Sequence, residues 1–174
     1  EELLTQMAFN YLQSQQDDKF LATVDTVQTM TSSHPSICYF LGSYHLRKNN
    51  TAQAKEWFEK TVYYNRKLTI ANYYLAGIYA RENKWNEVFE NVVAFEEGGG
   101  NLVQAFNLGI QSAERIGDRA YLAFFKAKKA ALEKDFNAVF QNLRLAVRLD
   151  PSLERAQDLL SQYEEALENQ QKRQ

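Results

Sequence analysis

The chain has 174 residues, of which 45% are apolar and 24% charged, and its formal net charge is −2. This balance does not favour binding to the phosphates of nucleic acid, and no apolar run approaches the roughly 20 residues of a membrane-spanning helix, so direct membrane insertion is not expected. The single cysteine, Cys38, excludes an internal disulfide framework, and the chain opens without the basic start and apolar core of a signal peptide.

A helical pattern recurs with a fixed period in the N-terminal part of the chain. Leu41-Gly42 is followed 34 residues later by Leu75-Ala76 and is preceded by Met7-Ala8 at the same interval. In each copy a large and a small residue come first, and a polar turn and a second apolar-periodic segment follow. A fixed period of this kind is typical of stacked helical hairpins, whose small residues let the paired helices approach closely.

We expect each copy to form two antiparallel helices joined by a short turn. The expected hairpins span residues 1–34, 35–68, 69–101 and 102–134. Asparagine or glycine marks three of the turns, because both tolerate the left-handed backbone that ends a helix; they are Asn49-Asn50, Asn83-Lys84 and Gly117-Asp118. The run Gly98-Gly99-Gly100 is interpreted as a helix stop before the fourth repeat, with a hinge as the alternative.

The helix phase becomes ambiguous after residue 117. Residues 135–151 look like the second helix of a hairpin, although by counting they should be the first helix of a fifth repeat. An inserted helix and an irregular hairpin both stay open as explanations. Residues 135–170 are therefore expected to form an irregular hairpin and an amphipathic capping helix, whose polar back closes the open end of the array, before a tail at 171–174.

Residues 1–116 resemble tetratricopeptide repeats (TPR). The matching residues are Leu41-Gly42, Tyr44-His45, Ala54 and Phe58 in one copy and Leu75-Ala76, Tyr79, Asn83 and Trp85 in the next. The chain departs from the family pattern at His45, where Tyr is usual, and at Asn49 and Asn83, where Gly is usual. The resemblance implies an all-α fold in a single domain: a right-handed superhelix of antiparallel helix pairs, with about nine or ten helices and a C-terminal cap.

The resemblance also implies a concave surface lined by the first helix of each hairpin. Aromatic and arginine side chains on such a surface are typical of protein-binding hot spots, and arginine can hold a carboxylate. The expected groove residues are Phe9, Tyr39, Ser43, Arg47, Tyr73, Gly77, Arg81, Phe106 and Ile110. In the alternative interpretation, aromatic residues such as Phe40 and Tyr74 belong to the core between repeats, and the arginines only solvate a face.

Chaperone-binding members of the family hold a C-terminal carboxylate with a clamp of Lys, Asn and Arg side chains. The matching positions here carry none of that chemistry, so binding to the EEVD-type tails of heat-shock chaperones is not expected; they are Thr5, Phe9, Phe40, Ile70 and Tyr74. No metal or other cofactor is expected, because His34, His45 and Cys38 lack a metal-ligand spacing and no Lys-Ser or Lys-Thr follows the glycine run.

The expected function is therefore a non-enzymatic scaffold or adaptor that binds a peptide or helix of a partner protein. Acidic residues in that partner would suit the arginines of the groove. One alternative is a structural or self-association module whose groove is filled in cis, and another is a regulatory domain of a longer protein. The cytoplasm is favoured as the location. The lack of an initiator methionine suggests a processed or excised chain, and for such a chain the periplasm stays open.

Overall fold

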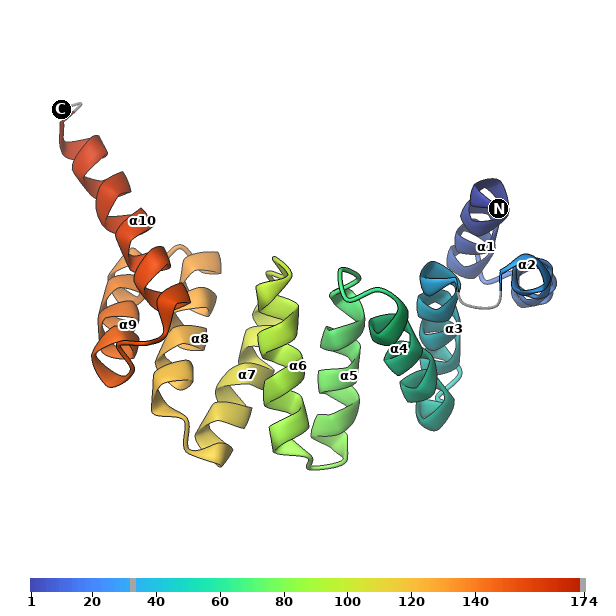
Figure 1. Cartoon of the computed structure of the whole chain (residues 1–174), viewed down its shortest axis with the longest axis horizontal. Coiled ribbons are helices and arrows are strands. Elements are labelled where there is room, and N and C mark those ends of the chain that lie inside the picture. Colours follow the sequence, from blue (N-terminus) through green and yellow to red (C-terminus); the bar gives the residue numbers. More distant parts are fainter. Residues whose placement is uncertain (32–33, 173–174) are drawn as a thin grey trace. The chain divides into compact units, whose positions relative to one another are not determined.

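The computed structural model describes residues 1–31 and 34–172, and within these ranges the chain forms ten helices and no strand (Figure 1). The helices are α1 (Glu2–Gln13), α2 (Asp17–Met30), α3 (Pro35–Arg47), α4 (Thr51–Tyr64), α5 (Ile70–Arg81), α6 (Trp85–Glu97), α7 (Val103–Ile116), α8 (Arg119–Leu132), α9 (Phe136–Leu149) and α10 (Glu154–Gln171). The expected all-α fold of helical hairpins is confirmed. The expected linker residues Ser32 and Ser33 and the tail residues 173–174 lie outside the described ranges.

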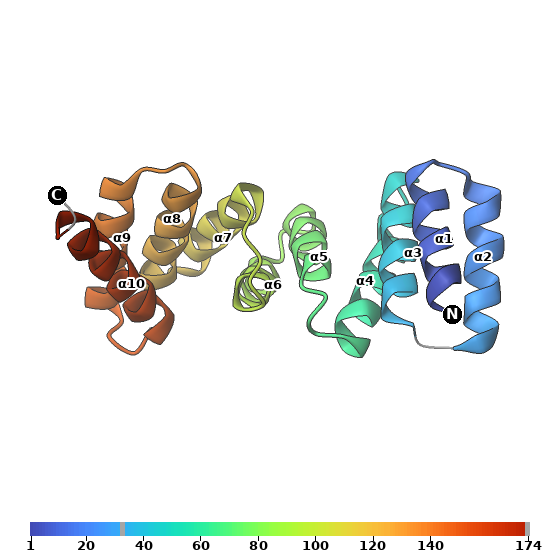
Figure 2. The ribbon, with the colours of Figure 1, turned by 90° about the horizontal axis from the view of Figure 1, so that it is seen from above.

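The chain divides into two compact units. The first comprises residues 1–78 and 94–100, which hold α1 to α4, most of α5 and the end of α6. Within it, α1 packs against α2 and α3, and α3 packs against α4; Figure 2 shows α1, α2 and α3 side by side. The second unit comprises residues 79–93 and those from 101 onward, and there α8 packs against both α7 and α9 while α10 packs against α9.

The contact between paired helices depends on a small residue in the first helix. A Cβ atom at Gly42 in α3 would lie 2.7 Å from the ring of Phe58 in α4, and that ring is fully buried. Ala8 and Ala76, at the equivalent positions of α1 and α5, are also fully buried. The large-small pair of the sequence therefore marks where the second helix crosses the first.

Buried positions in the second helices follow the small residue at constant intervals. After Gly42, the residues 12, 16 and 19 positions further along are Ala54, Phe58 and Thr61, and all three are fully buried. The residues at the same intervals after Ala8 and Ala76 are at most 3% exposed. After Ala8 they are Phe20, Val24 and Val27, and after Ala76 they are Val88, Val92 and Phe95.

This spacing resolves the helix phase after residue 117. It reappears from Ala127 in α8 to Val139, Leu143 and Ala146 in α9, all of which are fully buried. From Gly109 in α7 it is kept only in part: Phe125, 16 positions later, is fully buried and would lie 2.8 Å from a Cβ at Gly109, but the residues 12 and 19 positions later are only half-buried. Thus residues 136–149 have the spacing of a second helix relative to α8, while α8 also packs against α7.

The turns follow the same phase. The seventh residue after the small one has a left-handed backbone in four hairpins, with φ between 57° and 61°, at Gln15, Asn49, Asn83 and Lys134. The N–H of the next residue donates to a carbonyl five positions back, as in Asn50 to His45 at 2.8 Å and Asp135 to Ala130 at 3.0 Å. This hydrogen bond belongs to the Schellman helix end, which satisfies carbonyls that the helix leaves unpaired. Between α7 and α8 the left-handed residue is Gly117, one position later than in the other turns.

The glycine run after α6 is a close-packed helix end. A Cβ at Gly98 would lie 1.9 Å from the side chain of Thr69, and one at Gly100 would lie 2.4 Å from the carbonyl oxygen of Phe95. Gly99 has φ +83°, and the N–H of Gly100 donates to the Phe95 carbonyl at 2.8 Å. These contacts support the interpretation of this run as a helix stop.

The matched substitutions Gly42→Ala and Gly77→Ala test the helix contact. The new methyl group at position 42 would collide with a buried ring, so we expect a loss of about 1–3 kcal/mol in the free energy of unfolding. At Gly77 nothing lies within 4 Å of the added carbon, so alanine should stabilise the helix by about 0.5–1 kcal/mol. Urea unfolding followed by circular dichroism measures both, and equal effects would contradict this packing.

Replacing Lys134 by glycine tests the turn between α8 and α9. A left-handed conformation strains any residue with a Cβ atom, so Lys134→Gly should raise the free energy of unfolding by about 0.5–1 kcal/mol. The control Gln141→Gly, on the exposed side of α9, should lower it by about 1 kcal/mol in the same urea titration. A loss of stability at both positions would show that the turn is misplaced.

Candidate functional site

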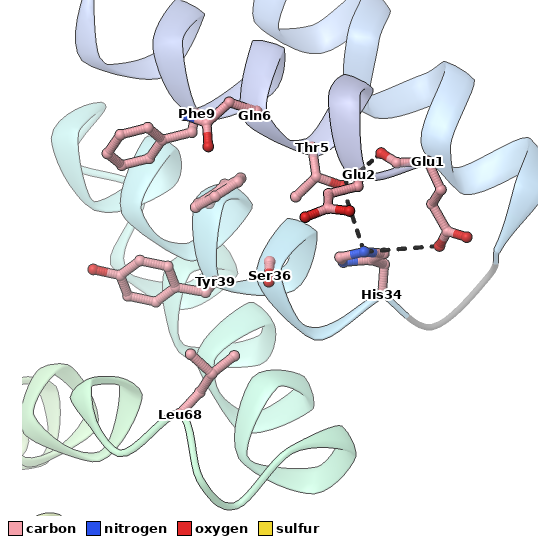
Figure 3. A pocket seen from close by; sticks show the side chains of 10 residues that line it. Glu1, Glu2, Thr5, Gln6, Phe9, His34, Ser36, Tyr39 and Leu68 are labelled. Carbon is pink, nitrogen blue, oxygen red and sulfur yellow. Dashed lines mark hydrogen bonds and ion pairs between the residues drawn. The ribbon is translucent and has the colours of Figure 1, made fainter.

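A groove runs along α1 and α3 in the first unit and consists of two adjacent pockets of about 800 and 300 Å3. Both are lined by Phe9, Tyr39 and Phe40. The larger pocket, drawn in Figure 3, is also lined by Glu1, Glu2, Thr5, Gln6, His34, Ser36 and Leu68. The smaller pocket is also lined by Leu12, Gln13, Gln15, Ser43, Arg47 and Tyr74. We call these two pockets together the α1–α3 groove.

The floor of the groove is aromatic. Phe40 lies between Phe9 and Tyr39, with ring centroids 5.6 and 5.9 Å apart, and the Tyr39 ring lies 6.2 Å from that of Tyr74. Tyr74 in turn stacks on the buried ring of Phe58 at 5.0 Å and an interplanar angle of 5°. Phe9 is 37% exposed, whereas Phe40 is almost completely buried. The floor is thus anchored in the core at Phe40 and Tyr74 and open to solvent at Phe9.

Four of the nine expected groove residues line the smaller pocket together, namely Phe9, Tyr39, Ser43 and Arg47. Tyr73 is half-buried, and its ring lies 5.4 Å from that of Tyr74 and 6.0 Å from that of Phe95. Its neighbour Tyr74 lines the groove and also contacts the core, so it combines the two roles that the sequence left as alternatives. Gly77 is half-buried with open space beside it.

The expectation that Phe106 lines an open groove is wrong. Its side chain is fully buried, its ring stacks on that of Phe125 at 6.3 Å, and the Nζ of Lys128 lies 5.7 Å from its centroid. The physical reason is the packing of α7 on α8: the Phe106 ring stacks on Phe125, the ring that also lies against Gly109. Arg81 is exposed and Ile110 half-buried in the second unit, and their part in a groove stays a prediction.

Arg47 is engaged within the protein. It donates a hydrogen bond of 2.7 Å from Nη1 to the carbonyl oxygen of Leu12, and Nη2 pairs with the carboxylate of Asp17. Lys48 contacts the other oxygen of Asp17 at 2.6 Å. The end of α3 is therefore tied to the end of α1 and to the start of α2.

The charges around Asp17 change its titration. The hydrogen bond from Lys48, together with the charges of Arg47 and Lys48, holds the pKa of Asp17 below its ordinary value, and Asp17 raises the pKa of Lys48. Because Arg47 already has a carboxylate partner, an acidic residue of a binding partner would compete with Asp17 for its guanidinium.

The other end of the groove carries acidic side chains. The Nε2 of His34 lies 3.7 Å from a carboxylate oxygen of Glu1 and 3.4 Å from the hydroxyl of Thr5 (Figure 3). Glu2 lines the same pocket from the first turn of α1. The sequence pattern did not predict Glu1 and Glu2 as groove residues. The expected groove positions are counted from the large-small pair of each repeat, and both glutamates precede the first pair, Met7-Ala8.

Comparison with known proteins finds the fold but no related sequence. No protein-family model matches the chain, and no curated protein is similar to it in sequence. The MamA protein has a similar structure, with a TM-score of 0.61 at 13% identity over 99% of this chain and 96% of that chain. TTC0263, a thermophilic TPR protein of Thermus thermophilus, has a TM-score of 0.54 at 13% identity over 95% and 98% of the two chains. The chain therefore has the fold of TPR proteins, as its repeat pattern predicts.

Membrane spans and metal clusters are both missing from the part of the chain that the structure describes. Within it, no helix combines the length and apolar character needed to cross a bilayer. The same residues contain no group of three or more His, Cys, Asp or Glu side chains placed to hold a metal ion.

The pH dependence of stability tests the Asp17 ion pairs. Because the folded protein lowers the pKa of Asp17, this carboxylate stabilises the fold above its ordinary pKa of about 3.9, and the contribution disappears as the pH falls through the lower folded value. Wild type should therefore exceed Asp17→Asn in urea midpoint at pH 7, and the difference should vanish towards pH 2. The control Asp18→Asn removes a carboxylate from the same helical turn but leaves both ion pairs intact, so it should cost less at pH 7. Equal losses for the two variants would contradict the role of the ion pairs.

Proposed function

We propose that this chain is a protein–protein interaction module that holds a segment of a partner protein in the α1–α3 groove. The observation that carries the proposal is the partly exposed aromatic floor formed by Phe9, Tyr39 and Phe40 between two pockets. Aromatic rings supply large contact area with few rotatable bonds, so they lose little entropy when a partner binds. The TPR fold is consistent with this role, although fold alone does not define function.

The dimensions of the groove favour a short segment. The 12 residues of α1 span about 18 Å, at 1.5 Å per residue. An extended peptide covers that distance with about five or six residues, and a helix with about three turns. A segment of this length can contact both pockets at once, which fits the recognition of a linear peptide or of one face of a helix.

The environments of Cys38 and His45 do not favour catalysis. Burial raises the pKa of the Cys38 thiol, which disfavours the nucleophilic thiolate. Burial also lowers the pKa of His45, so this side chain stays neutral over a wider range of pH. Both residues are part of the packing of α3, and we assign neither of them a catalytic role.

Phe9→Ala tests the groove because it removes the most exposed ring of the floor. Both this variant and the control Tyr63→Ala, which removes a tyrosine that is 83% exposed at the end of α4, should keep the circular dichroism spectrum of wild type. In affinity purification from native lysate, Phe9→Ala should retain the specific partner at least about tenfold less, the effect of losing a hot-spot residue. Tyr63→Ala should retain it as wild type does.

A photo-crosslinking amino acid at Gln13 identifies which surface the partner touches, because Gln13 lines the smaller pocket. Crosslinks from position 13 to the retained partner, with none from a probe at position 63, would support the groove. Equal retention by wild type and Phe9→Ala would refute the proposal. If the crosslinked species is a second copy of this chain, the module instead serves self-association.

A further inference from the structure

We infer that the segment held in the α1–α3 groove carries a lysine or arginine about three residues from an apolar anchor residue. The inference rests on the proposed function and specifies its partner. The arginines of the sequence suggested an acidic partner, and the inference here is a basic one. An acidic partner would need a free cationic group in the groove.

The charge around the larger pocket is acidic. The ionisable residues that line it are Glu1, Glu2 and His34. Glu1 and Glu2 are both exposed. The contact between Glu1 and His34, at 3.7 Å, is longer than a hydrogen bond and leaves the carboxylate oxygens able to accept from a stronger donor.

The cationic groups at the opposite end of the groove already contact a carboxylate of the protein. Arg47 pairs with Asp17 and donates to the Leu12 carbonyl, and Asp17 also binds Lys48. A carboxylate from a partner would share these two cations with Asp17, whereas the side chains of Glu1 and Glu2 are exposed. Electrostatic complementarity therefore favours a cation at the Glu1–Glu2 end over an anion at the Arg47 end.

The geometry sets the spacing of the two partner residues. Glu2 and Phe9 are seven residues apart on α1, which corresponds to about 10 Å along the helix axis. Figure 3 shows the carboxylates of Glu1 and Glu2 on one side of the pocket, near His34, and the rings of Phe9 and Tyr39 on the other. An extended segment covers about 10 Å in three residues. The partner should thus place its basic residue about three positions from the side chain that contacts Phe9 and Tyr39.

A random-peptide display selection on the folded protein tests the inference directly, because it needs no identified partner. Selection is run on wild type, on Glu1→Gln/Glu2→Gln and on Phe9→Ala. We expect peptides from wild type to be enriched in Lys or Arg about three positions from an aromatic or aliphatic residue. The double Gln variant should lose the basic enrichment and keep the apolar one, whereas Phe9→Ala should lose the peptides altogether.

The affinity of one enriched peptide measures how much each carboxylate contributes to binding. Fluorescence anisotropy at low salt should show about two- to fivefold weaker binding for each carboxylate removed, and the effect should shrink at high salt. The matched control Asp25→Asn/Glu56→Gln removes two exposed carboxylates from α2 and α4 of the same unit and should leave binding unchanged.

The outcomes separate this inference from the proposed function. Peptides that depend on Phe9 but show no basic preference, or an acidic one, would refute the inference and leave the groove standing. Peptides that bind Phe9→Ala as well as wild type, or a selection that enriches nothing on wild type, would refute both.

Discussion

The close approach of a small residue in one helix to a large residue in the next is the contact on which the described structure depends. At Gly42 the α3 backbone comes so near to Phe58 that even one added carbon atom would collide with the ring. A helix has no interior of its own, so a hairpin becomes stable only when such contacts exclude water on both sides. The regular spacing of buried residues in α2, α4, α6 and α9 follows from this one constraint.

The same contact positions the groove. Phe58 meets Gly42 on one side, stacks on Tyr74, and lies 6.1 Å from the ring of Tyr39. The core of the second hairpin and the floor of the α1–α3 groove are therefore one continuous aromatic cluster. Movement of Phe58 would displace the surface on which a partner is proposed to bind, so the stability of the hairpin and the shape of the groove are physically coupled.

The sequence predicts those parts of the fold that periodicity specifies and misses those that depend on local exceptions. The large-small pairs locate the hairpin contacts, and asparagine marks the turns at Asn49 and Asn83. Gln15 and Lys134 adopt the same left-handed backbone without a residue type that signals it, since tertiary packing imposes the turn on them. Phe106 fits an expected groove position by counting and is nevertheless buried, because its ring stacks on Phe125 of α8.

In the candidate site, too, periodicity predicts some residues, and others depend on contacts between distant parts of the chain. Phe9, Tyr39, Ser43 and Arg47 could be placed on one surface because helical periodicity fixes which side chains share a face. The engagement of Arg47 by Asp17 could not be predicted, because it joins residues 30 positions apart through the crossing of two hairpins. The acidic end of the groove likewise depends on how the first turn of α1 lies against the start of α3.

The double role of α8 limits how this chain can change in evolution. It pairs with α7 on one side and α9 on the other, and of its 14 residues only Arg119 and Lys126 are exposed. Arrays of identical modules can gain or lose a unit by recombination, because each new junction reproduces an old one. Here the module boundary passes through a helix that both neighbours share, so a 34-residue duplication or excision at this point would leave one partner without its counterpart.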